Sequence, residues 1–425
     1  MLIAGCGSES AAREPFRASG PPGVVRVGLA DFRWPLDPAL AEGRDETTLA
    51  RALYSTPLRT DPASGAVVPG LCSGWSSSDG FRRWTFNCRS APAIAAALRR
   101  VAHLPDAPAN WIFAQADRIS ADSRTLSIRL RFPWRRFPYA LTAVGAAPRT
   151  VPGPFELVSG SKRRVVLRSE GLRVEFERVA PREAVREFRQ GALDEAPIPV
   201  GDVGATTADR RIGSAVRTRT LLAMDAVLLP PIGHGLRVVY RDTAARGDYE
   251  ELIPEAAGAG AFGFFGDEKG SPARFRRAVA AIRTLPRRHV PIDVPPALRA
   301  GARILYAQWR DVGLGPKLVS GSANSDASFV RLTSSYPQQE AIPAELVLRH
   351  GLEPRRAVLQ ALAATKQQGR LKRVDAGLWA AARAVPIAWV VDARLVSPRL
   401  EGWREDALGN VDYTVISSRA SSQGP

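Results

Sequence analysis

The chain has 425 residues, of which 45% are hydrophobic and 24% charged, which are ordinary values for a globular protein large enough to form more than one lobe. The formal net charge of +17 would suit a polyanionic partner, but the arginines are spread along the whole chain and no basic run is interleaved with aromatic residues, so we expect no nucleic-acid binding. No apolar stretch reaches the roughly 18 residues of a membrane span.

The first residues, LIAGCGSES, place Cys6 after the small residues Ala4 and Gly5. Small residues before a cysteine are what a lipoprotein signal peptidase requires, and the cysteine then carries the lipid. Only five residues precede Cys6, whereas a signal peptide needs an apolar run of about 7–15 residues. Either the natural start lies upstream and residues 1–23 are a lipobox remnant with a flexible tether, or Cys6 is incidental.

Hydrophobic periodicity predicts alternating strands and helices. Strands are predicted over 24–30, 125–132, 162–168, 172–179 and 387–402. Helices are predicted over 45–58, 91–104, 182–191, 271–285, 295–313 and 354–386. Ser271 followed by Pro272 is typical of a helix start, and residues 198–235 are predicted to be mainly loop. The alternation indicates an α/β protein with two lobes.

The stretch CSGWSSSDGFRRWTFNC is predicted to form a β-hairpin that turns at Asp79 and Gly80. A three-residue loop would place Cys72 opposite Cys88, whereas a two-residue loop would shift the pairing by one. A disulfide between the two cysteines is expected if the protein is exported, and two buried thiols if it is cytosolic.

Motifs for cofactors and catalysis are weak. GAGAFG (258–263) matches a dinucleotide-binding fingerprint in its letters, but the residues around it do not read as a strand before and a helix after, so we expect a loop. The four histidines are scattered, which gives no metal-binding spacing. We therefore expect no cofactor, no metal and no catalytic residues.

Several segments, in order, resemble the extracellular solute-binding proteins of ABC importers for oligopeptides, dipeptides and nickel (solute-binding protein family 5). The matching segments are RVGLADFRWPLDPA (26–39), LARALYSTPL (49–58), DPASGAVVPGLCSGWSSSDGFRRWTFNCR (61–89), VPGPFEL (151–157), FRQGALDEAP (188–197), WRDVGLGPKL (309–318) and ARLVSPRLEGWREDALGNVD (393–412). Together they span about residues 24 to 415. The chain departs from the family by lacking the stretch that normally follows WTFNCR, and by being shorter.

The resemblance implies a cluster-C (type II) periplasmic-binding-protein fold, with two α/β lobes joined by a hinge and a subdomain inserted in the first lobe. The expected first lobe is 24–45, 154–225 and 387–425. The expected inserted subdomain is 46–153, and the expected second lobe is 226–386.

The resemblance also implies a function: a monomeric, lipid-anchored protein at the extracellular face of the cytoplasmic membrane, or in the periplasm if an outer membrane is present. It would capture a peptide or similar small solute by hinge closure and deliver it to an ABC permease and ATPase. The alternative is a degenerate relative that acts as a surface sensor or scaffold without transport; an enzyme is not expected.

Site residues follow from the same resemblance. In SDASFVRLTSSYP, Asp326 takes the position of the aspartate that pairs with the α-amine of a peptide, and Tyr336 takes the position of an aromatic residue ten places later. Leu332 stands where the family has tryptophan. Tyr54 and Trp34 are expected as further walls of the ligand site.

Overall fold

The computed structural model describes residues 21–244, 260–265, 271–285, 289–321, 325 and 327–418. Two of the residues singled out above, Cys6 and Asp326, and the start of the GAGAFG motif lie outside this part of the chain. Among the described residues, no helix combines the length and the apolar character that crossing a bilayer would require.

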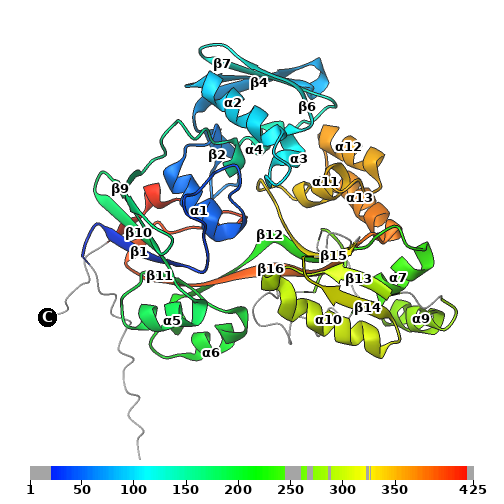
Figure 1. Cartoon of the computed structure of the whole chain (residues 1–425). Coiled ribbons are helices and arrows are strands. Elements are labelled where there is room, and N and C mark those ends of the chain that lie inside the picture. The colour runs from blue at the N-terminus through cyan, green and yellow to red at the C-terminus, as the bar shows by residue number, and fades with distance from the viewer. Residues whose placement is uncertain are drawn as a thin grey trace, which may run out of the picture.

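A ten-stranded mixed sheet runs through the whole molecule (Figure 1). In spatial order its strands are β14 (Gly315–Val319), β13 (His289–Asp293), β15 (Ala327–Thr333), β12 (Val216–Leu228), β16 (Ala384–Val396), β11 (Glu195–Pro197), β1 (Val24–Leu29), β10 (Leu172–Arg178), β9 (Arg164–Ser169) and β8 (Glu156–Gly160). We call the half from β11 to β8 lobe I, and the half from β15 to β14 lobe II.

The two lobes are connected by β12 and β16, which are thirteen residues long each and pair antiparallel. Their register shifts between Thr220 and Met224 and again after Asp225, so the two strands bend as they pass from one lobe to the other. The prediction that residues 198–235 are mainly loop is therefore wrong for β12, whose inner half is a buried central strand.

Helices cover both halves of the sheet (Figure 1). Those of lobe I are α1 (Gly43–Leu53), α5 (Pro181–Arg189) and α6 (Val203–Ala208). Those of lobe II are α7 (His234–Asp242), α9 (Pro272–Ile282), α10 (Arg299–Asp311), α11 (Ala341–Leu348), α12 (Arg355–Ala363) and α13 (Gln368–Ala381). At the start of α9 the Ser271 side chain accepts a hydrogen bond from Arg274 N, as its cap sequence predicts.

A smaller unit, the inserted subdomain, stands above the large sheet in Figure 1. Its elements are β2 (Leu58–Thr60), β3 (Val67–Pro69), β4 (Cys72–Ser78), β5 (Arg83–Cys88), α2 (Ala91–Ala102), α3 (Asn110–Phe113), β6 (Ala116–Ala121), β7 (Thr125–Leu130) and α4 (Phe137–Ala140). Strands β4, β5, β7 and β6 form a second sheet. Two short strands near the C-terminal end, β17 (Leu400–Glu401) and β18 (Ser417–Ser418), pair with each other.

Cys72 and Cys88 are joined by a disulfide across β4 and β5. The expected three-residue loop does not form, because the last strand pair before the turn is Ser78 and Arg83, which leaves four residues in the loop. A register shift between Cys72 and Gly74 then brings the two cysteines opposite each other. The cysteines thus meet through a bulge rather than through the turn that the sequence suggested.

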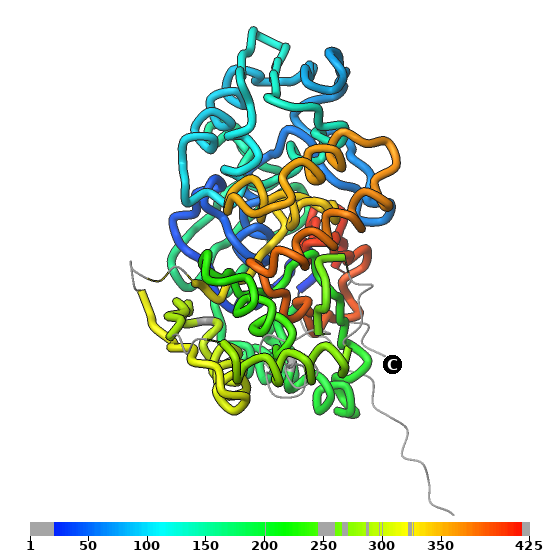
Figure 2. Tube along the Cα trace, turned by 90° about the vertical axis from the view of Figure 1, so that its right-hand side faces the viewer, coloured from blue at the N-terminus to red at the C-terminus, as the bar shows by residue number. Residues whose placement is uncertain are grey.

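The inserted subdomain and helices α11–α13 of lobe II share one hydrophobic core. Both Figure 1 and Figure 2 show these helices directly against the subdomain. Helix α1 instead packs with β1 in the core of lobe I, through Leu49 and Ala50. The boundary expected at residue 46 therefore falls inside a helix whose buried face belongs to lobe I.

Candidate functional site

A cavity of about 360 Å³ lies between the two lobes and beneath the inserted subdomain. We call it the interlobe cavity. Helix α1 and the loop before it form one wall, and β15 with the residues that follow it forms the opposite wall. Two subdomain loops, 106–109 and 143–145, and the C-terminal segment around Asn410 complete it.

The lining is mostly small or apolar, with hydroxyl groups gathered at the end of β15. Ala41, Val144 and Leu332 are examples of the apolar part. Thr333 and Ser334 supply the hydroxyl groups, although Ser334 Oγ donates to Tyr336 O. An apolar cavity with a few placed polar groups is typical of sites for small organic ligands.

Two arginines at the cavity wall, Arg331 and Arg349, are each paired with a carboxylate. Arg331 on β15 binds Asp225 on β12 through two hydrogen bonds of 2.7 and 3.0 Å. Arg349 binds Glu345 at 3.0 Å within the last turns of α11. Asp225 is fully buried, so its charge requires this partner.

Glu345 is a wall residue that titrates near neutrality. Its side chain is almost fully buried, and burial raises the pKa of its carboxyl to about 7, against the opposing effect of Arg349. The cavity can therefore change its charge between mildly acidic and mildly basic conditions.

Direct contacts fasten the subdomain to lobe II across the cavity mouth. Ser335 Oγ donates to Pro108 O at 3.1 Å. The backbone N–H of Arg135 donates to Leu362 O at 2.9 Å. A lobe movement that opens the cavity on this side has to break these bonds.

Three aromatic residues lie at the centre of the same contact, and we call them the aromatic cluster: Trp111, Trp134 and Tyr336. Their ring centroids are 5.9 to 6.1 Å apart, and all three side chains are buried. Tyr336 is thus a core residue between the inserted subdomain and lobe II. It does not line the interlobe cavity, whereas the resemblance implied that it contacts the ligand. Its hydroxyl has no hydrogen-bond partner in the described part of the chain, and burial raises its pKa well above the ordinary value.

The other two expected wall residues also lie away from the interlobe cavity. Tyr54 follows α1, and its hydroxyl donates to Leu36 O at 3.0 Å. The half-buried Trp34 packs in the core of lobe I, with its ring over Gly160 of β8. A Cβ added at Gly160 would overlap that ring, so glycine is required there.

Helix α1 is held in place by a buried network of six charged residues, which we call the lobe I charge network: Arg44, Asp45, Glu195, Asp392, Arg394 and Glu405. Arg44 lies 2.9 Å from Glu195 and 3.1 Å from Glu405. Arg394 lies 2.6 Å from Asp45 and 3.2 Å from Glu195. Because Arg394 belongs to β16, the network ties α1 to one of the two strands that connect the lobes.

Sequence reasoning did not find the residues that line the interlobe cavity. Ser334 and Ser335 directly follow a strand, and Glu345 and Arg349 stand four residues apart, as helix-face pairs do. Those signals were present, but the helix around Glu345 was not predicted. Among the described residues, no group of three or more His, Cys, Asp and Glu side chains is arranged to hold a metal ion.

No protein-family model matches the chain. No curated protein matches its sequence. Solved structures do match: the murein tripeptide binding protein MppA of Escherichia coli is 16% identical, with a TM-score of 0.77 over 94% of this chain and 99% of MppA.

Two further structures match to a similar extent. OppA of Haemophilus influenzae, solved with the peptide RPPGFSPFR, is 15% identical, with a TM-score of 0.76 over 94% of this chain and 99% of OppA. AgaA of A. tumefacien R10, solved with agropinic acid, is 13% identical, with a TM-score of 0.77 over 94% of this chain and 100% of AgaA. The similarity covers nearly the full length of each protein, and the chain therefore has the type II periplasmic-binding-protein fold that its sequence predicted.

Proposed function

We propose that the chain captures a short peptide, or a solute of similar size and polarity, in the interlobe cavity. The observation that supports this most strongly is a cavity of about 360 Å³ walled by both lobes and the subdomain. Its apolar lining suits small side chains, and its hydroxyl and backbone groups suit peptide amides. A cavity of this volume fits a ligand of two or three residues rather than a long peptide.

In this proposal the protein is the substrate-binding component of an ABC importer and catalyses no reaction. The bending strands β12 and β16 serve as the hinge, and closure around the ligand allows delivery to a permease and its ATPase. Cys6 carries a lipid that anchors the protein at the extracellular face of the membrane. The structures that support this role differ in the ligands they hold, which are peptides in one case and agropinic acid in another.

Asp326 remains the proposed partner of a ligand α-amine. It directly precedes β15, the strand that lines the cavity. An amine enclosed between two lobes loses its water, so it needs a carboxylate. Losing one partner of a buried charge pair costs about 3–5 kcal/mol, so Asp326→Asn should weaken peptide binding a hundredfold or more.

Two measurements test the proposal. Native mass spectrometry of protein purified without refolding should show a bound molecule of small mass. Short peptides with a free N-terminus should raise the melting temperature, and N-acetylated versions should raise it much less. Equal effects of free and acetylated peptides contradict the amine contact, and a lack of binding by any peptide contradicts peptide capture.

A second candidate function is a surface sensor or scaffold that does not transport. The observation that favours it is the direct attachment of the subdomain to lobe II, through the aromatic cluster and the bond between Arg135 and Leu362. Small-angle scattering separates the two functions. An importer component should become more compact when ligand is added, whereas a permanently closed scaffold should not change.

A further inference from the structure

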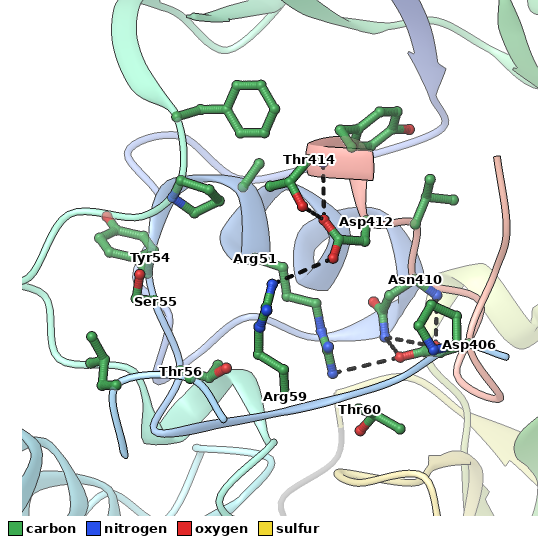
Figure 3. Close-up of a pocket in the computed structure, with 18 of the residues that line it drawn as sticks. Arg51, Tyr54, Ser55, Thr56, Arg59, Thr60, Asp406, Asn410, Asp412 and Thr414 are labelled. Atoms are coloured by element: carbon green, nitrogen blue, oxygen red, sulfur yellow. Dashed lines mark hydrogen bonds and ion pairs between the residues drawn. The ribbon is translucent and has the colours of Figure 1, made fainter. Parts of the chain in front are cut away.

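A second cavity, of about 230 Å³, lies on the other side of α1, and we call it the lobe I cavity (Figure 3). Its walls are the segment after α1, strand β2, the end of β3 with the residues that follow it, and the C-terminal segment 406–414. Arg51 and Asn410 line both this cavity and the interlobe cavity, so the two cavities are neighbours with a common wall.

Two buried polar atoms at the lobe I cavity have no hydrogen-bond partner among the residues that the structure describes. One is the guanidinium nitrogen Nε of Arg51, and the other is the hydroxyl Oγ1 of Thr60, a residue that is only 9% exposed. Buried polar groups in proteins are nearly always satisfied, and an unsatisfied one costs about 1–3 kcal/mol. Both atoms belong to side chains that line the same space, so a single ligand can satisfy both once these side chains turn toward it.

Arg51, Arg59 and Arg89 line this cavity, and the first two are held only loosely by carboxylates. Arg51 Nη2 lies 3.7 Å from Asp406, and Arg59 Nη1 lies 3.7 Å from Asp412, both beyond hydrogen-bond distance. Figure 3 shows the two arginine side chains between the segment 54–60 and the C-terminal segment. Arg51 Nη2 also donates to Thr142 O and Arg59 Nε to Pro69 O, each at 3.3 Å, so the other N–H groups of the two side chains are the donors for an anion.

The aspartates are engaged elsewhere. Asp406 accepts bonds from the backbone N–H groups of Leu408 and Asn410 and from the Asn410 amide. Asp412 Oδ1 accepts from both the N–H and the hydroxyl of Thr414, and Oδ2 lies 3.7 Å from Arg59 Nη1 and accepts no hydrogen bond from the residues that the structure describes. Two negative charges in the wall disfavour a doubly charged anion such as phosphate, but an open carboxylate oxygen suits an ammonium group.

The apolar part of the wall includes Pro62, Pro69, Leu71 and Phe155, and the rest of it is polar, with Ser55, Thr56 and Arg89 among its residues. We propose that the lobe I cavity is a second ligand site, which binds a free amino acid with an apolar side chain. Arg51 and Arg59 bind its carboxylate together with the Thr60 hydroxyl, Asp412 faces its ammonium group, and the apolar wall covers its side chain. This site does not depend on peptide binding in the interlobe cavity.

The test is calorimetric titration of the full chain with L-leucine, L-leucinamide and inorganic phosphate. Leucine should bind, and leucinamide and phosphate should bind at least about tenfold more weakly, because each lacks one of the matched charges. Arg59→Gln should weaken leucine binding about tenfold, and Thr60→Val several-fold. Both variants should fold, since Arg59 is half exposed and valine has the shape of threonine.

Arg83→Gln is the matched control, because Arg83 is an exposed arginine of the subdomain that lies outside both cavities. It should bind leucine like the unmodified chain. The proposal is overturned if leucine fails to bind up to roughly 10 mM, if leucinamide or phosphate binds as well as leucine, or if Arg59→Gln and Thr60→Val leave the affinity unchanged. In that last case leucine binds elsewhere, and the peptide-binding role stays untouched.

Discussion

Two buried contacts are held by different interactions. The lobe I charge network fastens α1 within lobe I, and the aromatic cluster lies between the inserted subdomain and lobe II. The lobe I charge network satisfies its carboxylates with arginines at 2.6 to 3.2 Å. The aromatic cluster relies on ring packing, and its Tyr336 hydroxyl and two indole N–H groups find no partner among the described residues. Charge pairs fix a single geometry, whereas apolar contact can separate without leaving an unpaired charge. Separating the charge network therefore costs unpaired buried charge, whereas separating the aromatic cluster costs exposed apolar surface.

Removal of one carboxylate from the lobe I charge network should have the largest effect. Burial raises the pKa of Glu195, but Arg44 and Arg394 outweigh it and keep the pKa below the ordinary value, so this carboxyl is ionised. Glu195→Gln leaves two buried arginines undercompensated and should lower the free energy of unfolding by about 3–5 kcal/mol. Urea unfolding measures this change in the free energy of unfolding. Glu156→Gln, which alters an exposed ion pair, should cost less than about 1 kcal/mol, and similar losses in the two variants would contradict the comparison.

Two buried tyrosines, one in each contact, give a matched test of the difference between the lobe I charge network and the aromatic cluster. The Tyr413 hydroxyl donates to Glu195 at 2.9 Å, whereas the Tyr336 hydroxyl has no partner. Tyr413→Phe should destabilise the protein by about 1.5–3 kcal/mol, and Tyr336→Phe should change its stability by less than about 0.5 kcal/mol or increase it slightly. Thermal unfolding of both variants decides the matter, and a large loss in Tyr336→Phe would show that the aromatic cluster contains a polar contact.

The pH dependence of stability should come from Glu405 and Glu345. Burial raises the pKa of Glu405 to about 8, and Asp392 adds to the effect while Arg44 opposes it; the pKa of Glu345 is about 7. Both carboxyls stay neutral to higher pH in the folded state than in the unfolded chain. Their contribution to stability is therefore fully present below about pH 4.5 and is lost as the pH rises through about 7 and about 8.

This loss should be roughly 4 kcal/mol between pH 6 and 9, measured by urea unfolding. Glu405→Gln, which keeps a neutral side chain at every pH, should flatten the upper part of the profile. An unchanged slope in this variant would assign the effect to other groups. Asp392 has the opposite effect on stability at low pH. Burial raises the pKa of its carboxyl, but Arg44 and Arg394 outweigh burial and hold the pKa below the ordinary value, so the stability that Asp392 contributes is lost as the pH falls.

The sequence predicted the outer elements of the fold better than the central ones. Amphipathic α2 and the alternating β10 have one polar face, so their periodicity is visible. Helix α11 is buried from Ala341 to Val347 and therefore has no polar face to reveal it. Strand β12 interrupts its buried run with Asp225, which is tolerated only because Arg331 on the next strand pairs with it.

The candidate site was less predictable than the fold. The interlobe cavity is built from segments as distant as Ala41, Asp106, Ser334 and Asn410, which only the folded chain brings together. The resemblance implies a ligand site near β15, with aromatic residues as its walls. Tyr336 and Trp34 are aromatic because they fill cores. Residue type alone does not separate a core ring from a ligand wall.

The most direct test of ligand capture is to fill the interlobe cavity and measure binding. Thr333 lies at the end of β15 on the cavity wall and is not fully buried, so Thr333→Trp places a large ring in the space without disturbing either core. Calorimetric titration with a short peptide that stabilises the unmodified chain should show one binding event for the unmodified chain and none for Thr333→Trp. Equal affinity in both proteins would contradict the claim that the ligand is held between the lobes.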